Sequence, residues 1–512
     1  MRGDLTSALI YTDLWTDEML TGSGIPVFDV PLVLIGSGIG SFVTYDILRI
    51  YGVPARSMAV LGPQDVPWSS YEYLVTCSQI PRAERLRSDS ASEPDNMWGF
   101  PSYAVREAFA EKTLAPLWNV LTEPILSNYY TPRAGQVFLG MEREFRRIGY
   151  SDSLRKGQVR MVRKRAGGGY FTILTPPQGT APTKRVAFRS AYVHVAVGYP
   201  GLKLLPDLQE YRERYRDPTR VVNAYEPHEH VYQALQRRPG VVMIRGSGIV
   251  ASRVLQRLID DRDRLHLDTR ILHLFRHYIA KPRGPAFRSR RPGGDGWSYQ
   301  GFNYPKSVWG GQLKAKMRRL QGDQRAEAYR RFGGTSTPIR NTWRAQLRRG
   351  RREGWYQVMA GTARDLRPAA PGGVRTTIVP DPSAPLPFPP PTQPFDSTVD
   401  YIIDCTGLEA DIREHRLLAD LLDHTGAGRN PVGRLDVDTT FELIGTRSGG
   451  GRVYASGSAT LGGPFPGVDT FLGLQIAAQE IADDLAALGF CPRMGPLRSA
   501  RQWWLWMTDK KI

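Results

Sequence analysis

The chain has 512 residues, too many for one hydrophobic core, so we expect two or more domains. Hydrophobic residues make up 41% of it and charged residues 23%, as in ordinary soluble globular proteins, and no stretch approaches the roughly 20 uncharged apolar residues of a membrane span. The net charge of +18 fits a nucleic-acid surface, an acidic membrane face or an anionic substrate, but it also fits a general preference for arginine, because the basic residues are dispersed.

The N-terminal residues place acids where a signal peptide would have its apolar core, which predicts a cytoplasmic protein without a membrane partner. The three cysteines, Cys77, Cys405 and Cys491, are far apart and form no CxxC pair, so we expect no disulfide framework. His228 and His230 stand two residues apart in a probable loop and give no fixed ligand geometry. We therefore expect no metal site.

Strand and helix patterns alternate along the chain and repeat one strand–turn–helix–strand unit. The first unit covers 31–62 and the second 241–275. Between them the pattern is helical over 100–150 and β over 158–197. A Trp-rich tail at 502–507 is expected to bury its aromatic side chains in this chain or a second subunit. The segments before it are an Arg-rich helical stretch over about 277–360, a Pro-rich loop or hairpin excursion over 368–394, strands at 400–407 and 452–458, and a helix over 472–488.

The first unit contains a Gly-rich turn between a strand and a helix, the context that a dinucleotide fingerprint requires. Its first glycine permits a tight turn, the second lets the backbone approach a pyrophosphate, and a small third residue lets the helix pack on the strand. The acid expected after the next strand is replaced by Leu61-Gly62, with Asp65 as a late substitute. A Gly-rich turn without a nucleotide is the alternative. The candidate residues are Gly36, Gly38, Gly40 and Ser41.

The second unit repeats this pattern at Gly246, Ser247, Gly248 and Ala251. Its second strand ends in Arg276 rather than an acid. A cation at this point suits an adenosine 2′-phosphate, so NADPH is favoured over NADH. The alternative is a surface arginine in an Arg-rich chain.

Together with later motifs, the two turns resemble the NADPH-dependent class B flavin monooxygenases. Their Ala-Thr-Gly-Tyr-Pro motif is similar to Val195–Pro200, and a later Asp-xxx-Leu-Ala-Thr-Gly-Tyr motif is similar to Asp400–Leu408, with Asp404 in place of Leu and Cys405 in place of Ala. The resemblance assigns further flavin or nucleotide contacts to Arg87, Ser88, Thr406, Gly407, Gly457 and Ser458.

The resemblance implies an α/β fold with two Rossmann-like domains that bind FAD and NADPH, the NADPH domain being inserted in the FAD domain. The FAD-binding domain would comprise residues 1–220 and 398–512. The NADPH-binding domain would comprise 221–397, with a helical Arg-rich insert at about 277–360.

Within this class the chain is nearest the branch that N-hydroxylates amines and amino acids. That branch carries a Phe-x-Asn-Glu segment similar to Phe302–Pro305, although Tyr304 replaces the glutamate. Asn303 is therefore a substrate candidate, and the equal alternative is a turn residue before Tyr304-Pro305. The Baeyer–Villiger motif is absent, because Pro338 stands where its histidine should be. Upstream arginines could orient a substrate carboxylate, or could instead face the NADPH phosphates or solvent. They are Arg288, Arg290 and Arg291.

By the same resemblance, NADPH would reduce the flavin, O2 would add to give a C4a-(hydro)peroxide, and a small polar amine or amino acid would attack it. No acid–base pair stands out, so no catalytic residue is assigned. Other flavin-dependent NAD(P)H oxidoreductases that oxygenate sulfur or carbon are the alternative. A basic flavoprotein acting on nucleic acid is a further one, although we expect no nucleic-acid partner. A homo-oligomer is compatible with the Trp-rich tail.

Overall fold

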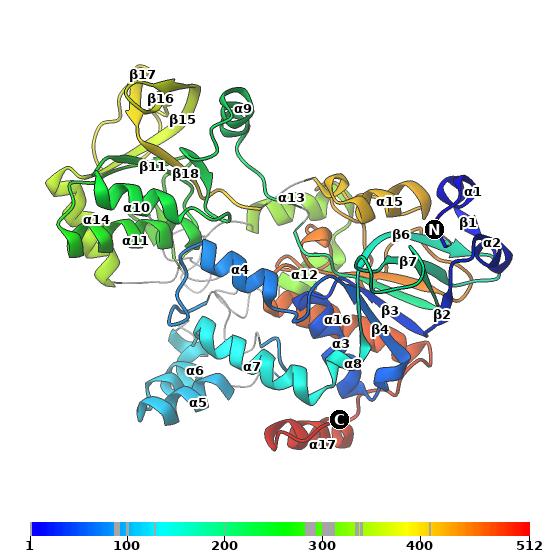
Figure 1. Cartoon of the computed structure of the whole chain (residues 1–512). Coiled ribbons are helices and arrows are strands. Elements are labelled where there is room, and N and C mark those ends of the chain that lie inside the picture. The colour runs from blue at the N-terminus through cyan, green and yellow to red at the C-terminus, as the bar shows by residue number, and fades with distance from the viewer. Residues whose placement is uncertain are drawn as a thin grey trace.

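The structure is a computed structural model that describes residues 3–86, 93–98, 102–126, 130–199, 201–281, 293–299, 313–332, 337, 341–408 and 411–512. Figure 1 shows two α/β domains, the first at the lower right with both chain termini and the second at the upper left. This is the expected mixed α/β architecture with two parallel-rich sheets.

The first domain is built on a five-stranded parallel sheet. Every residue of its central strand, Leu32–Ile35, is buried, as expected for a parallel sheet covered on both faces. Helices α3 (Ile39–Tyr51) and α16 (Phe471–Ala487) pack against each other in this domain. In spatial order the strands are β19 (Arg452–Ala455), β9 (Tyr192–Val195), β3 (Leu32–Ile35), β4 (Met58–Gly62) and β5 (Leu154–Lys156).

A second five-stranded sheet of the first domain joins the N-terminal segment to the β region after residue 157. Its three central strands are antiparallel, and each edge strand pairs parallel to its neighbour. The order is β1 (Leu14–Trp15), β6 (Gln158–Arg165), β7 (Tyr170–Thr175), β8 (Val186–Ser190) and β2 (Val27–Asp29), with helices α1 (Ser7–Tyr11) and α2 (Asp17–Ser23) beside it.

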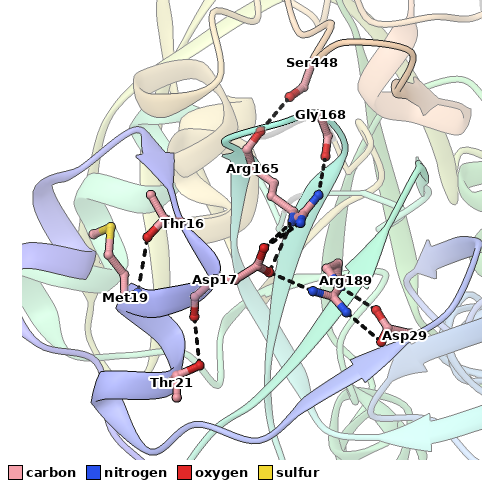
Figure 2. A network of polar contacts seen from close by, with 9 residues as sticks. All are labelled: Thr16, Asp17, Met19, Thr21, Asp29, Arg165, Gly168, Arg189 and Ser448. Carbon is pink, nitrogen blue, oxygen red and sulfur yellow. Dashed lines mark hydrogen bonds and ion pairs between the residues drawn. The ribbon is translucent and has the colours of Figure 1, made fainter.

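An ion-pair network holds the N-terminal segment on this sheet (Figure 2). Asp17, the first residue of α2, accepts hydrogen bonds from Arg165 of β6 and from Arg189 of β8. Arg189 also donates to Asp29 of β2, with Nη2 2.8 Å from Oδ2. Hydrogen bonds from Arg165 lower the pKa of Asp17. Because these side chains are partly exposed, we interpret the network as a contact that positions the N-terminal segment at the edge of the sheet.

The second domain has a seven-stranded sheet, in which the first five strands are parallel and the last two are each antiparallel to the strand before them. The predicted boundary at residue 398 leaves the strand Tyr401–Asp404 outside the second domain. In the structure this strand lies between two strands of the second domain's sheet. The Pro-rich stretch begins in a β-hairpin, as one of its two interpretations predicted. The strands are β10 (Val221–Asn223), β18 (Tyr401–Asp404), β11 (Val241–Arg245), β12 (Arg270–Phe275), β15 (Tyr356–Ala369), β16 (Gly373–Pro380) and β17 (Phe395–Val399).

The described part of 277–360 contains three helices, which belong to different parts of the molecule. Helix α14 (Asn341–Glu353) connects β12 to its parallel neighbour β15, so it is the crossover helix of the second sheet. Helices α12 (Leu313–Arg319) and α13 (Gly322–Phe332) instead contact the first domain. Arg318 donates to both carboxylate oxygens of Glu480 on α16, at 2.7 and 2.9 Å, and Tyr329 packs on the first domain's core.

The remaining elements cover the two domains. In the second domain these are α9 (Pro206–Tyr215), α10 (Glu229–Arg237), α11 (Ile249–Leu265) and the short strands β13 (Gly293–Gly294) and β14 (Trp297–Ser298). In the first domain they are α4 (Ser69–Cys77), α5 (Ser102–Glu111), α6 (Ala115–Leu126), α7 (Ala134–Arg147), α8 (Tyr150–Ser153), α15 (Arg416–His424), α17 (Pro496–Met507) and the 3-10 turns η1 (Ala55–Ser57), η4 (Ile412–Glu414) and η5 (Gly457–Thr460). Of the helices described, none is long and apolar enough to cross a bilayer.

The Trp-rich tail forms helix α17, and the prediction of buried aromatics holds for one of its tryptophans. Trp506 is 3% exposed, whereas Trp503 and Trp504 are 39% and 59% exposed. Burial within this chain is therefore confirmed for Trp506. For Trp503 and Trp504, burial against a second subunit stays a prediction.

Candidate dinucleotide-binding sites

The first Gly-rich turn has the backbone that the fingerprint predicts. Gly36 has φ +99°, and a Cβ at this position would lie 2.3 Å from the Ala196 carbonyl oxygen, so only glycine fits. Gly38 is the N-cap of α3 in extended conformation, and a Cβ there would meet nothing closer than 3.7 Å. A Cβ at Gly40 would meet that of Ala196 at 2.9 Å, and Ser41 is fully buried. The turn therefore packs closely against Ala196, just after β9, whereas the space beside Gly38 is free for a further group.

The missing acid after β4 has a steric explanation. A Cβ at Gly62 would lie 2.4 Å from the Ser37 hydroxyl oxygen and 2.5 Å from the Ser37 nitrogen, so no acidic side chain can stand there. The same hydroxyl accepts a hydrogen bond from the Gln64 backbone N–H at 2.9 Å. Asp65 forms an ion pair with Lys156 and its side chain is 71% exposed. The structure thus gives Asp65 a cationic partner on β5.

Three chain segments meet at the carboxyl edge of the first sheet. The segment after β9 contacts the one after β19, because the Ser458 hydroxyl donates to the Gly198 carbonyl at 2.7 Å. Gly457 adopts φ +78°, a conformation that favours glycine. Tyr199 donates to Asp469, just before α16, at 2.8 Å. The structure therefore brings Gly198, Gly457 and Ser458 to the sheet edge that bears the first turn.

The second turn has nearly the same backbone as the first. Gly246 has φ +122°, and its Cβ would lie 2.5 Å from the Cys405 carbonyl oxygen. Gly248 is the N-cap of α11 with φ −91° and ψ −171°, against −84° and −172° for Gly38. Ala251 is fully buried. The segments after β9 and β18 thus occupy equivalent places, which explains their related motifs.

A buried histidine that the sequence did not single out supports the second turn. His273 of β12 lies 2.6 Å from the Gly246 carbonyl oxygen through Nε2 and 2.8 Å from the Tyr356 hydroxyl through Nδ1. Because a carbonyl only accepts, Nε2 carries the proton and Nδ1 accepts from Tyr356. Burial lowers the pKa of His273 to about 3, so the ring is neutral. Only its place one strand away from the turn could have suggested this role.

Asp404 departs from the family motif, and the structure shows what its carboxylate holds. It accepts hydrogen bonds from the backbone N–H and hydroxyl of Thr406, at 2.9 and 2.6 Å, and from the Leu205 N–H at 3.1 Å. Burial raises the pKa of Asp404, and the hydrogen bonds from Thr406 and Leu205 oppose that rise. The Asp404 carboxylate therefore binds both segments that connect the two domains, the one that contains Leu205 and the one that contains Thr406. Gly407, with φ +131°, follows in open space.

Arg276 directly follows β12, which is the strand next to the one that leads into the second turn. The Arg276 side chain is exposed. Across the described ranges it forms no ion pair with an acid of this chain. Ser247 lies in the turn itself. The remaining predicted contacts, Arg87, Ser88, Asn303, Arg288, Arg290 and Arg291, lie outside the described residues.

The cysteines are buried, and Cys405 packs below the second turn. Burial raises the pKa of the Cys405 thiol well above its usual value, which is the environment of a structural cysteine. In the part of the chain that the structure describes, histidine, cysteine and acidic side chains form no group that could bind a metal.

Several solved structures with the same fold are N-hydroxylases. The ornithine N-hydroxylase of Kutzneria sp. 744, solved with reduced FAD, NADP+ and L-ornithine, matches with a TM-score of 0.64 over 90% of this chain and 99% of that one, at 13% identity. The FAD-bound cadaverine monooxygenase DfoA of Erwinia amylovora gives 0.63 over 92% and 98%, at 12%. The bacillithiol disulfide reductase Bdr of Bacillus cereus gives 0.52 over 90% and 99%, at 13%.

No protein-family model and no curated protein matches the sequence. The fold therefore defines the class: a chain with two Rossmann-like domains, in the fold that the ornithine N-hydroxylase and the cadaverine monooxygenase share. That fold also carries a disulfide reductase, so the reaction has to be argued from the sites.

Proposed function

We propose that this protein is an FAD- and NADPH-dependent monooxygenase that N-hydroxylates a small polar amine or amino acid. The observation that carries the proposal is the pair of equivalent Gly-rich turns, each at the carboxyl edge of its own parallel sheet. Such a pair suits an enzyme that brings two dinucleotides together, and the fold extends over the full length of an ornithine N-hydroxylase.

The residues of the first turn suit FAD. The open space at Gly38 can admit a pyrophosphate, and the backbone N–H groups at the start of α3 can bind it. Residues 1–220 and 398–512 would form the FAD-binding domain, although β18 belongs to the second sheet. When bound, FAD supplies the redox chemistry and the reaction with O2, while the protein orients the reactants and excludes water.

The second turn suits NADPH. Gly246, Ser247 and Gly248 would bind its pyrophosphate, and the exposed Arg276 would pair with the adenosine 2′-phosphate. The substrate residues remain proposals from the sequence: Asn303 for the substrate or nicotinamide ribose, and Arg288, Arg290 and Arg291 for a substrate carboxylate.

Two observations separate this function from its competitors. A disulfide reductase needs paired reactive thiols, whereas the three cysteines are buried and lie far apart in sequence. A nucleic-acid surface needs available cations, but three arginines of α14 are paired with acids. Arg348 and Arg351 bind Asp295 at 3.0 and 2.8 Å, and Arg349 binds Asp263 at 2.6 Å.

The test combines cofactor and product. We expect NADPH to reduce the bound flavin anaerobically and faster than NADH, and oxygen then to yield a hydroxylamine or nitroso product from one of a panel of diamines and amino acids. The product, rather than NADPH loss, is to be measured by mass spectrometry. Because the amine must be unprotonated to react, turnover is expected to rise with pH.

The same panel includes sulfides and ketones as controls. Oxygenation of these compounds alone would exclude N-hydroxylation but leave the cofactor assignment intact. Equal reduction by NADH and NADPH would remove the role of Arg276. Binding of nucleic acid with an affinity that falls steeply with salt would support the competing basic flavoprotein.

A further inference from the structure

Helix α11 begins at the second nucleotide turn, and one turn along it the side chain of Arg253 crosses to the first domain. Its Nη1 lies 3.0 Å from Glu84 Oε2, and its Nε donates to the Gln79 carbonyl at 3.2 Å. The Arg253 and Glu84 side chains are only 13% and 10% exposed. A charge-assisted hydrogen bond with so little water around it is stronger than a surface ion pair.

A second arginine of the same helix strengthens this contact. Arg257 donates from Nη1 to the side-chain oxygen of Gln79 at 3.1 Å. Gln79 has φ +59°, a left-handed conformation that a non-glycine residue adopts at a cost. Two arginines from α11 thus bind a residue whose backbone is already constrained, which is the pattern of a fixed contact between domains.

The segment that receives these contacts is itself held by the first domain. The Glu84 carbonyl accepts from the Ala134 N–H, and the Leu86 N–H donates to the Pro132 carbonyl, both at 2.9 Å. Arg85 donates to the Thr131 carbonyl at 2.6 Å and pairs with Glu107. Arg87 and Ser88, the expected flavin contacts, follow next in the sequence.

We propose that Arg253 and Glu84 are positioning residues that set how the second nucleotide is presented to the flavin. The proposal rests on the proposed function and deepens it. With both nucleotides bound, the step concerned would be hydride transfer from NADPH to FAD, which would leave NADP+ and carry both electrons to the flavin. The ion pair joins helix α11, which begins at the second turn, to the segment of the first domain that contains Glu84. Because a misplacement of about 1 Å can slow such a reaction about a hundredfold, this pair controls the rate rather than the affinity.

The first experiment measures anaerobic flavin reduction by stopped-flow spectroscopy, together with NADP+ affinity by calorimetry. For Glu84→Gln and Arg253→Gln we expect the reduction rate at saturating NADPH to fall on the order of tenfold or more. NADP+ affinity and FAD content should stay within about twofold of the parent, because both turns remain intact. The charge-reversed double variant, Glu84→Arg with Arg253→Glu, should recover part of the rate.

Arg264→Gln is the matched control. Arg264 lies on the same helix and pairs with Asp261 at 2.8 Å, but this pair stays within the second domain and its arginine is 69% exposed. We expect this variant to reduce its flavin at the parent rate. Reduction rates within twofold of the parent for both Glu84→Gln and Arg253→Gln would overturn the proposal.

A second readout needs no cofactor. Lys203 is exposed in the connection between the domains, so trypsin cleavage there reports how freely the domains separate. The two single variants should be cut faster than the parent and Arg264→Gln, and unchanged cleavage would contradict the proposal. If NADPH failed to reduce the parent protein, the proposed function would be lost, whereas the cleavage rates would still decide whether this pair holds the domains.

Discussion

At the scale of single residues, Gly38 and Gly36 constrain the first turn in different ways. Gly38 has room for a side chain and is the N-cap of α3, a position where aspartate is favourable. Gly38→Asp should therefore leave the apoprotein as stable as the parent, or more stable by a few tenths of a kcal/mol. Its carboxylate would repel the pyrophosphate, so FAD affinity should fall roughly tenfold or more. Flavin absorbance per protein and the apoprotein melting temperature measure the two effects.

Two further variants separate charge from shape. Gly38→Asn has the size of aspartate without its charge and should retain more FAD than Gly38→Asp. Gly36→Ala should instead destabilise the fold, because its Cβ would meet the Ala196 carbonyl oxygen and φ is +99°. Full FAD occupancy in a folded Gly38→Asp protein would show that the first turn has been misassigned.

Sequence could predict these glycines because the fingerprint is local. It could not predict why the acid at the end of β4 is missing, since the cause is the close approach of Ser37, in the first Gly-rich turn, to Gly62. The same limit applies to Asp404, which looked like a departure from a motif. Its carboxylate instead binds Leu205, almost 200 residues earlier in the chain. Such contacts follow from tertiary structure and leave no periodic signal.

At the scale of elements, helix α17 holds the segment 93–98 against the first domain through Trp506. The indole Nε1 donates to the Asp95 carbonyl at 3.0 Å, the ring lies 5.9 Å from that of Trp98, and Arg143 stands 4.9 Å above it. We expect Trp506→Ala to cost about 3–5 kcal/mol of unfolding free energy. Trp504→Ala on the exposed face should change it by no more than about 0.5 kcal/mol. Equal losses in denaturant titrations would contradict this placement.

Elements were predicted where their pattern was long and periodic. The strand–turn–helix units of β3–α3–β4 and β11–α11–β12 and the helix α16 fall within a few residues of expectation. The Arg-rich stretch was predicted as one insert because periodicity identifies a helix but not the surface it covers. In the structure α14 crosses over within the second sheet, and α12 and α13 contact the first domain.

At the scale of the whole molecule, each of the two parallel-rich sheets contains one buried, neutral histidine. His194 of β9 lies 2.9 Å from the Ser456 hydroxyl through Nε2, and its Nδ1 lacks a hydrogen-bond partner among the described residues. Burial lowers the pKa of His194 to about 3, the same value as for His273 in the second sheet. Acidification should therefore weaken both domains, because protons bind the unfolded chain more tightly than the folded one.

Asp95 opposes this trend within the first domain. Burial raises the pKa of Asp95 to about 6, so between its usual 3.8 and 6 the folded state binds a proton that the unfolded state releases. Protonation of Asp95 therefore favours folding as the pH falls, whereas protonation of the histidines favours unfolding. Variants that remove one histidine at a time are needed to isolate its effect from that of the carboxyl group.

For each histidine the sign follows from its lowered pKa. Its contribution is complete above about pH 6.5 and is lost as the pH falls towards 3, because only the unfolded chain is protonated in that window. Between pH 7 and pH 5 the loss is about 2 kcal/mol per histidine. His273→Gln, which keeps a donor for the Gly246 carbonyl, and His194→Gln should each reduce the pH dependence by that amount, whatever their stability at pH 7. Urea titrations at both pH values, resolving the two domains, measure it, and a pH dependence equal to the parent's would show that neither histidine is neutral in the folded state.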